Sequence, residues 1–264
     1  MAPRVLFSSA AFFARPLSDT FRLMADAGYT GAEVLVTRDL ESQDGATMSH
    51  LAARFGLTIE AIHAPALLLT RRVWGTDPVG KIDRAIQEAR EAEVSLVVMH
   101  PPYRWQHRYR RWLQDELPAI EERTGVTVAI ENMFPVHVGS RPLTFHANAD
   151  LDTLEGLPHL VLDTSHAAVA RHDPREVRRR FGKRLRHVHL SDNAGKGWDS
   201  HLPPGDGVLP LESFCRELAA QGFEGAVSLE VDLRAGLADP ERLVQKMAAM
   251  REDVESWLEG GRDR

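Results

Sequence analysis

The residues best suited to chemistry in this chain are histidines and carboxylates, and they gather where short β-rich segments end. The densest group lies in residues 187–207, HVHLSDNAGKGWDSHLPPGDG, which hold three histidines and three aspartates. Residues 185–190 alternate as a strand does, so we expect His187 and His189 to face the same side. The remainder is rich in glycine and proline and predicts a loop. A strand that ends in imidazoles and opens into a polar loop is typical of the active-site face of a parallel α/β barrel.

Eight short β-rich segments alternate with eight helical ones along the whole chain. The predicted strands are residues 5–8, 32–36, 58–63, 96–100, 127–131, 160–163, 186–190 and 227–230. The predicted helices are residues 17–27, 46–55, 78–92, 106–123, 150–156, 174–181, 211–221 and 239–258. Strict strand–helix alternation indicates a parallel sheet, and eight such units without a long linker indicate a closed barrel.

Residues typical of helix starts support this division of the chain. Aspartate followed by proline supplies an N-cap and a suitable first helical residue at Asp77, Asp173 and Asp239. We therefore predict one α/β domain, a (β/α)8 TIM barrel over residues 1–264. The last five residues, GGRDR, are expected to be frayed.

The composition is that of an ordinary soluble globular protein. Of the 264 residues, 43% are hydrophobic and 27% are charged, and the net charge is −6. Such a chain has no general basic field that would draw it to nucleic acid or anionic lipid. The single cysteine, Cys215, excludes an internal disulfide and cysteine-based zinc clusters, and it lies in a helical pattern that predicts burial.

Neither end of the chain predicts a membrane partner. No apolar run approaches the roughly 20 residues that a membrane span needs. The N-terminal segment has one basic residue and an interrupting serine pair, so a first strand explains it better than a signal peptide does. We therefore expect a cytoplasmic protein, and no sequence feature selects an oligomeric state.

The candidate ligands all lie at strand ends or in the loop after the seventh strand. In a barrel these ends share one mouth, so residues far apart in sequence converge there. Five imidazoles and four carboxylates in a dry mouth would repel one another or stay unsatisfied without cations. Zinc, manganese and iron accept this ligand set, and we predict one to three divalent ions, with zinc or manganese ahead of iron. The nine residues are His63, His100, Glu131, Asp163, His166, His189, Asp199, His201 and Glu230.

Short motifs around these residues resemble the xylose-isomerase-like barrel superfamily, which includes sugar-phosphate isomerases and epimerases and the endonuclease IV family. The resemblance spans essentially the whole chain. The sequences DTSH and HLSD are fairly specific for the superfamily, although they do not choose a reaction. The motifs are IHAP (62–65), HPP (100–102), IEN (130–132), LDTSHA (162–167), HLSD (189–192), LPPGDG (202–207) and LEV (229–231).

The isomerase and epimerase branch implies a single metal ion and a small carbohydrate-like substrate. By this resemblance Glu131, Asp163, His189 and Glu230 hold the ion, and a sugar or sugar phosphate reacts through a metal-stabilised enediolate. Glu131 and Glu230 exchange protons as acid and base. His166 binds a substrate oxygen. Glu33 matches a common carboxylate of the second strand, and its role is to support a ligand, to bind substrate or to stabilise the fold.

The endonuclease IV branch implies three zinc ions and a phosphodiesterase reaction on DNA or a smaller phosphate ester. His63, His100, Asp199 and His201, together with His166, complete its three-zinc set. Many epimerases of the superfamily carry arginine where His201 stands, which favours this alternative. The acidic charge and the absence of an aromatic residue after His63, where the chain reads APALLL, oppose a duplex-DNA substrate.

Basic and aromatic residues near the mouth leave further roles open. Arg104, Trp105 and Tyr109 follow the fourth strand and could grip a phosphate or stack on a substrate, or simply begin an amphipathic helix. The basic residues of 175–186 are expected to form a solvated outer face. A third class of function, an iron-dependent oxidase or a binding protein, also remains consistent with the ligand set.

Overall fold

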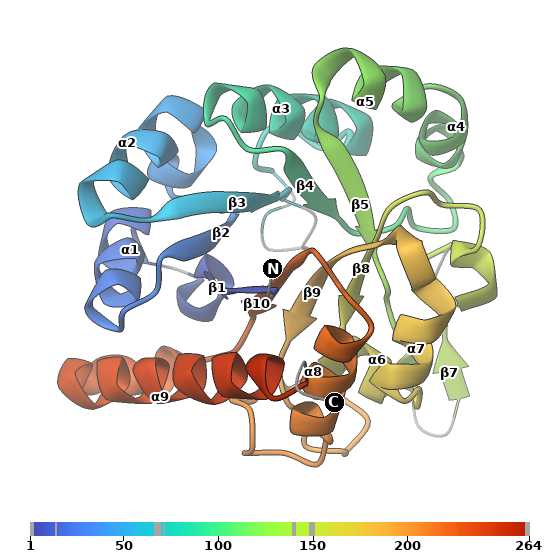
Figure 1. Cartoon of the computed structure of the whole chain (residues 1–264). Coiled ribbons are helices and arrows are strands. Elements are labelled where there is room, and N and C mark those ends of the chain that lie inside the picture. The colour runs from blue at the N-terminus through green and yellow to red at the C-terminus, as the bar shows by residue number, and fades with distance from the viewer. Residues whose placement is uncertain are drawn as a thin grey trace.

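Eight parallel strands close into a barrel, with helices between successive strands (Figure 1). The computed structural model describes residues 3–13, 15–65, 70, 72–138, 141–147 and 151–261. Around the barrel the strands follow the order β1, β10, β9, β8, β5, β4, β3, β2, which returns to β1. The predicted single-domain (β/α)8 TIM barrel is therefore confirmed. The barrel strands are β1 (Arg4–Ser8), β2 (Gly31–Leu35), β3 (Thr58–His63), β4 (Leu96–Met99), β5 (Thr127–Glu131), β8 (Leu160–Asp163), β9 (Leu185–Leu190) and β10 (Ala226–Leu229).

Helices surround the strands, and their starts follow the capping signals of the sequence. Each of the three predicted aspartate N-caps accepts a backbone N–H of the first turn that follows it, at Asp77, Asp173 and Asp239. The helices are α1 (Leu17–Asp26), α2 (Gly45–Phe55), α3 (Pro78–Glu91), α4 (His107–Asp115), α5 (Leu117–Thr124), α6 (Thr164–Val169), α7 (Pro174–Phe181), α8 (Leu211–Ala220) and α9 (Pro240–Glu259).

The helix predicted at 106–123 is two helices in the structure. It breaks at Glu116 into α4 and α5. Pro118 lies in the first turn of α5, where its missing N–H costs nothing, whereas inside a continuous helix it would remove a hydrogen bond and clash with the preceding turn.

The connection between β5 and β8 is more elaborate than the predicted helix at 150–156. An antiparallel hairpin of β6 (Val136–Val138) and β7 (Arg141–Leu143) comes first. A 3₁₀ helix, Leu151–Leu154, replaces the predicted α-helix. The short helix α6, which begins directly after β8, was not predicted.

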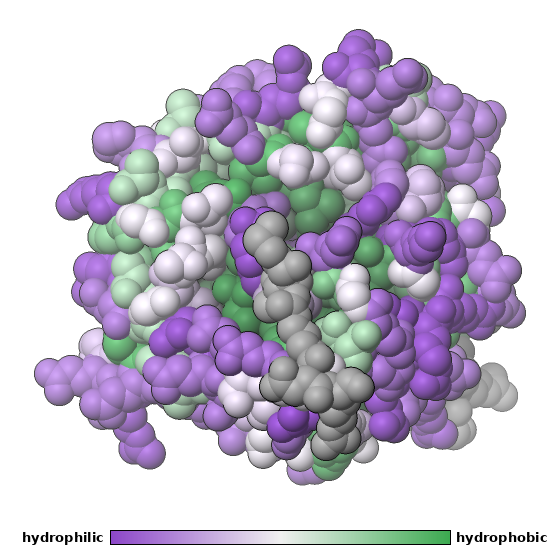
Figure 2. All heavy atoms as spheres, in the orientation of Figure 1, coloured by the Kyte–Doolittle hydropathy of each residue, from purple (hydrophilic) through white to green (hydrophobic). Residues whose placement is uncertain are grey.

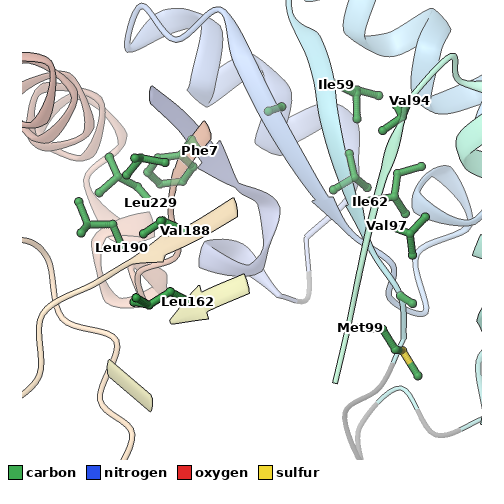
Figure 3. Packing of buried hydrophobic residues seen from close by; sticks show 14 of the residues in the cluster. Phe7, Ile59, Ile62, Val94, Val97, Met99, Leu162, Val188, Leu190 and Leu229 are labelled. Carbon is green, nitrogen blue, oxygen red and sulfur yellow. The ribbon is translucent and has the colours of Figure 1, made fainter. Parts of the chain in front are cut away.

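The main hydrophobic core lies between the strands and the surrounding helices. It contains buried side chains from every barrel strand. Figure 3 shows two parts of it, one around β1, β8, β9 and β10 and the other around β3 and β4. The labelled members are Phe7, Leu162, Val188, Leu190 and Leu229 in the first part and Ile59, Ile62, Val94, Val97 and Met99 in the second.

Inside the barrel the side chains are small near the middle and polar toward the carboxyl ends of the strands. A small cluster of fully buried side chains consists of Ala61, Val98, Ala129 and Val161. Two residues after each member of this cluster, at the end of the strand or directly after it, stands a candidate ligand: His63, His100, Glu131 and Asp163. Because side chains alternate along a strand, the same inward face carries the apolar cluster and then the ligands.

The surface is polar around a hollow. On the face seen in Figure 2, hydrophilic side chains cover most of the rim, and hydrophobic ones show mainly toward the middle. Among the described residues, none of the helices has the length and apolar character that crossing a membrane requires. Cys215 is buried, as predicted. Of the C-terminal tail, residues 262–264 lie outside the described residues.

Candidate metal centre

The carboxylate of Glu131, the last residue of β5, is the hub of the site. Four imidazole nitrogens lie between 3.0 and 3.5 Å from its oxygens. Burial by itself raises the pKa of the Glu131 carboxyl, but the imidazoles outweigh burial and hold that pKa well below its usual value. The four imidazoles belong to His63, His100, His166 and His189.

A compact four-residue group surrounds His189. Its Nδ1 lies 3.0 Å from Oε1 of Glu131, 2.8 Å from Oε2 of Glu230 and 3.9 Å from Oδ2 of Asp163. One ligand atom from each of the four residues lies within 4.8 Å of the others. One oxygen of each carboxylate has no donor in hydrogen-bonding geometry among the described residues: Oε2 of Glu131, Oδ2 of Asp163 and Oε2 of Glu230. Buried carboxylate oxygens without donors suit a cation, so this donor set fits a divalent metal ion.

The pKa values of Asp163 and His189 are both raised, which favours the protonated forms of these two groups. Burial raises the pKa of Asp163 to about 6, against the imidazoles that lower it. Burial lowers the pKa of His189, but the carboxylates of Glu33, Glu230 and Glu131 together raise it well above its usual value. Metal binding requires deprotonated ligands, so a bound cation would displace these protons.

A second group of donors centres on Asp199 in the loop after β9. Its Oδ2 lies 2.8 Å from Nε2 of His201 and 3.3 Å from Nε2 of His166. The Ser165 hydroxyl donates to its other oxygen at 2.6 Å. His166 also faces Glu131, so this group adjoins the first one. The structure therefore brings all nine predicted ligand residues into one connected network.

Three histidines of the network are held by main-chain carbonyls, and we call them the backbone-anchored histidines. A carbonyl oxygen only accepts, so in each ring Nδ1 carries a proton and donates it. When such a ring is neutral, its Nε2 carries a lone pair. In all three histidines Nε2 faces a carboxylate of the site. Metal-ligating histidines are commonly oriented in this way. They are His63, His166 and His201, whose Nδ1 atoms lie 3.0, 2.9 and 2.9 Å from the carbonyl oxygens of Ala64, Asn132 and Glu230.

Glu33 lies on the far side of His189 from the other carboxylates. Its oxygens face Nε2 of His189 at 2.9 Å and Nε2 of His187 at 3.0 Å. Glu33 is fully buried. Its position is that of a residue that orients an imidazole.

The loop after β9 is tied to the end of that strand by one carboxylate. Asp192 accepts backbone N–H groups at distances between 2.8 and 3.1 Å from Asn193, Gly205, Gly207 and Leu209. A Cβ at residue 207 would collide with this carboxylate, so the position requires glycine. The HLSD and LPPGDG motifs are therefore two halves of one structure, which carries Asp199 and His201.

An aromatic ladder leads from the surface toward His100. Trp105 is 62% exposed and stacks on Tyr103, with ring centroids 4.9 Å apart. Tyr103 stacks on His146 at 4.5 Å, and His146 meets the edge of His100 at 6.3 Å. The backbone of the adjacent Arg104 donates to Phe145. Among the described residues, the rings of Tyr103 and His146 link Trp105 to the site.

Tyr109 is unavailable to a substrate. Its ring is buried, and its hydroxyl donates to the carbonyl of His100 at 2.9 Å. The suggestion that Tyr109 stacks on a substrate is therefore wrong. The tyrosine instead supports the end of β4.

Two histidines of the site region had no assigned role in the sequence. His187 was expected to face the same side as His189, and the period-2 pattern gave the only signal for it. His146 lies after the unpredicted hairpin, where no strand-end rule applies. Both became recognisable only through their contacts.

The basic residues of α7 and its surroundings are engaged by nearby acids. Arg175 bonds Asp173 at 2.7 Å, and Arg179 lies 3.5 Å from Glu217. Arg180 bonds Glu155 at 2.7 Å. These ion pairs are partly exposed and lie on a helix outside the barrel, which supports a solvated face rather than a nucleic-acid footprint.

Comparisons with known proteins agree with this architecture. The model of the family described as "Xylose isomerase-like TIM barrel" matches residues 21–258. An uncharacterized protein of Mycobacterium tuberculosis is 35% identical over 260 residues, which cover 91% of this chain and 93% of that protein.

Two solved structures share the fold. D-psicose 3-epimerase with D-tagatose, from Clostridium cellulolyticum H10, has a TM-score of 0.73 at 16% identity, over 97% of this chain and 99% of that chain. The IOLI protein with a binding zinc atom has a TM-score of 0.70 at 19% identity, over 96% of this chain and 98% of that chain.

Proposed function

The chain belongs to the xylose isomerase-like TIM barrel family, and on that premise we propose that it is a divalent-metal-dependent isomerase or epimerase of a small sugar or sugar phosphate. A D-psicose 3-epimerase and a zinc-bound protein share the fold, and both support the proposal. The observation that carries the proposal is the four-residue group of Glu131, Asp163, His189 and Glu230.

These four residues would hold the ion, with zinc or manganese preferred to iron. A divalent cation at this place polarises neighbouring substrate oxygens and makes the proton on the adjacent carbon more acidic. The protein supplies three carboxylates and one imidazole, and all four side chains are largely buried, which would limit the access of water to the ion.

Glu131 and Glu230 are the residues that would transfer the proton. They come from the ends of β5 and β10, which are separated around the barrel by β8 and β9, so they reach the cluster from different directions. One carboxylate removes the proton from the substrate carbon, and the other returns a proton to the same or the neighbouring carbon. Glu131 is held ionised at neutral pH, as a base must be.

The other residues at the mouth would bind and orient the substrate. The His166 ring lies between two carboxylates, with Nδ1 3.3 Å from Glu131 and Nε2 3.3 Å from Asp199, and its Nε2 would contact a substrate oxygen. We assign Trp105 and Arg104 to the outer part of the substrate site, where the aromatic ladder offers a stacking surface. Arg104 would serve a phosphate if the substrate carries one.

The first test is metal content per chain, measured by elemental analysis of protein purified without added metal or chelator. One ion per chain is the expected result. Candidate ketoses and their phosphates are then incubated in deuterated water, and NMR follows deuterium entry at the carbon beside the carbonyl. Deuterium entry that needs the bound metal supports the proposal, and its absence with every ketose and ketose phosphate in the screen counts against it.

A polynuclear zinc phosphodiesterase is the second candidate. The backbone-anchored histidines favour it, because their Nε2 atoms point at carboxylates in a way suited to additional ions. The double variant Asp199→Ala, His201→Ala separates the two. For an isomerase it should keep the ion of the four-residue group, whereas for a phosphodiesterase it should lose an ion and most activity on abasic-site DNA or a smaller phosphodiester.

A further inference from the structure

The inward face of β9 carries two histidines in succession. Val188 and Leu190 belong to the core between strands and helices, where Figure 3 places them with Phe7 and Leu229. Because side chains alternate along a strand, His187 and His189 face the barrel interior. Both imidazoles are almost completely buried, with 1% and 0% exposure.

Glu33 of β2 meets both imidazoles with both of its oxygens. Oε1 lies 2.9 Å from Nε2 of His189, and Oε2 lies 3.0 Å from Nε2 of His187. In the strand register Glu33 pairs with Ala61 and His187 pairs with Val161, both members of the small apolar cluster. A carboxylate among such neighbours is costly unless each oxygen receives a hydrogen bond.

The direction of these hydrogen bonds follows from the chemistry of the acceptor. An ionised carboxylate only accepts, so each imidazole donates its Nε2–H to Glu33. For His189 this leaves Nδ1 to face the metal cluster, at 3.0 Å from Glu131 and 2.8 Å from Glu230. If the His189 ring were rotated by 180° about its Cβ–Cγ bond, carbon atoms would take the places of both nitrogens. These carbons would then face Glu33 on one side and Glu131 and Glu230 on the other.

We infer that His187 and Glu33 are positioning residues, which act in series to fix the nitrogen that His189 presents to the metal cluster. The inference rests on the proposed metal site for its consequence. His187 contributes no ligand atom to the four-residue group, although its ring packs edge-on against that of His189 with centroids 5.3 Å apart. It acts by keeping the second oxygen of Glu33 occupied. Without that donor the carboxylate can turn toward His189 with either oxygen, and His189 loses its fixed orientation.

The test begins with metal-free protein labelled with ¹⁵N in histidine. Two downfield, slowly exchanging Nε2–H protons are expected from the imidazoles that donate to Glu33, one from His187 and one from His189. Long-range ¹H–¹⁵N correlations within each ring distinguish them from the Nδ1–H protons of the backbone-anchored histidines. His187→Phe removes the donor and should abolish the first signal and shift or broaden the second. His187→Gln places a donor near the same position and should restore the second signal. Ser228→Ala is the matched control, because this hydroxyl is equally buried on β10 and has no partner among the described residues.

Zinc affinity, measured by competition with a chelator, reports the consequence at the site. His187→Phe should weaken binding by about 10- to 100-fold, as is usual when the support of a metal ligand is removed. His187→Gln should recover most of the affinity, and Ser228→Ala should leave it unchanged. Equal melting temperatures for His187→Phe and Ser228→Ala would separate this loss from a general weakening of the fold.

The outcomes distinguish the inference from the proposed function. If zinc fails to bind the wild-type protein, the metal proposal fails, while the two N–H protons of the metal-free protein still decide the positioning role. An unchanged His189 signal in His187→Phe would overturn the inference. Loss of both wild-type N–H signals on adding zinc would also overturn it, because a cation would then lie between Glu33 and the imidazoles.

Discussion

Two parts of the site hold their imidazoles by different means. The backbone-anchored histidines His63, His166 and His201 donate to main-chain carbonyls at the mouth. His189 instead donates to one oxygen of Glu33, and the other oxygen of Glu33 accepts from His187. Carbonyls stay in place as long as the strand ends and loops do. The support of His189 depends on individual side chains, so a single substitution can release this imidazole while leaving the others in place.

The two kinds of support are disturbed by different substitutions. The backbone-anchored histidines tolerate changes in most neighbouring side chains, but they require loops with a fixed path. For His201 that path is set by Asp192 and its four backbone donors. The site therefore depends on a few side chains that do not touch its centre.

The largest effect is expected at Glu131, which both kinds of imidazole face. Glu131→Gln keeps the shape of the side chain and removes its charge, so the cluster loses its shared anion. Bound metal should fall to near zero, and deuterium entry into the substrate should slow by about 10²- to 10⁴-fold, the usual contribution of an acid–base group. Elemental analysis and NMR measure the two effects. Full metal content in this variant would remove Glu131 from the ligand set.

Asp192→Ala removes the acceptor that fixes the loop carrying His201. Hydrogen bonds to a buried charged group are each worth about 1.5–3 kcal/mol, and water can replace part of them, so we expect a loss of about 3 kcal/mol in the free energy of unfolding. Urea denaturation measures it, and Asp192→Asn, which keeps one acceptor oxygen, should lose less. The His189 N–H signal should persist in both variants. Its disappearance would mean that the two supports are coupled.

Lys81 is a cation that main-chain carbonyls hold, as they hold the backbone-anchored histidines. Its ammonium donates to the carbonyls of Pro65 at 2.7 Å and Thr70 at 3.1 Å, and burial lowers its pKa to about 8. The unfolded chain, with an ordinary lysine pKa near 10.4, binds more protons between these values, so this group makes the protein more stable as the pH rises from about 8 to about 10.4.

The corresponding measurement is the urea midpoint at several pH values between 7 and 10.5. Lys81→Met should flatten the rise in stability relative to the wild type, because the variant has no group that titrates there. Parallel curves for the two proteins would mean that Lys81 keeps an ordinary pKa.

The smallest effect on stability is expected at the outer end of the aromatic ladder. Trp105→Ala removes an exposed ring that, among the described residues, stacks on Tyr103, so the free energy of unfolding should change by less than about 1 kcal/mol. If the ladder binds substrate, KM should rise several-fold with little change in kcat. Trp198→Ala, which removes a similarly exposed ring from the loop after β9, is the control. Identical kinetics in the two variants would place Trp105 outside the substrate site.

The pattern of the sequence is enough to predict the barrel. It also predicts which end of each strand carries the polar residues. Three predicted strands, Thr58–His63, Thr127–Glu131 and Leu160–Asp163, have the predicted bounds. Period-2 burial and aspartate N-caps are local signals, and a parallel barrel places every strand end at the same mouth. The gathering of the nine candidate ligand residues at one mouth follows from this rule alone.

Only the tertiary structure decided how those groups face one another. Glu33 and His187 are 154 residues apart and lie on β2 and β9, with β1 and β10 between them. Their meeting depends on the tilt and register of the closed barrel, which no local pattern encodes. The same holds for the ring nitrogen that each histidine presents, because a distant carbonyl or carboxylate selects it. The sequence determined which groups reach the mouth, and the closed barrel decided which atoms point into it.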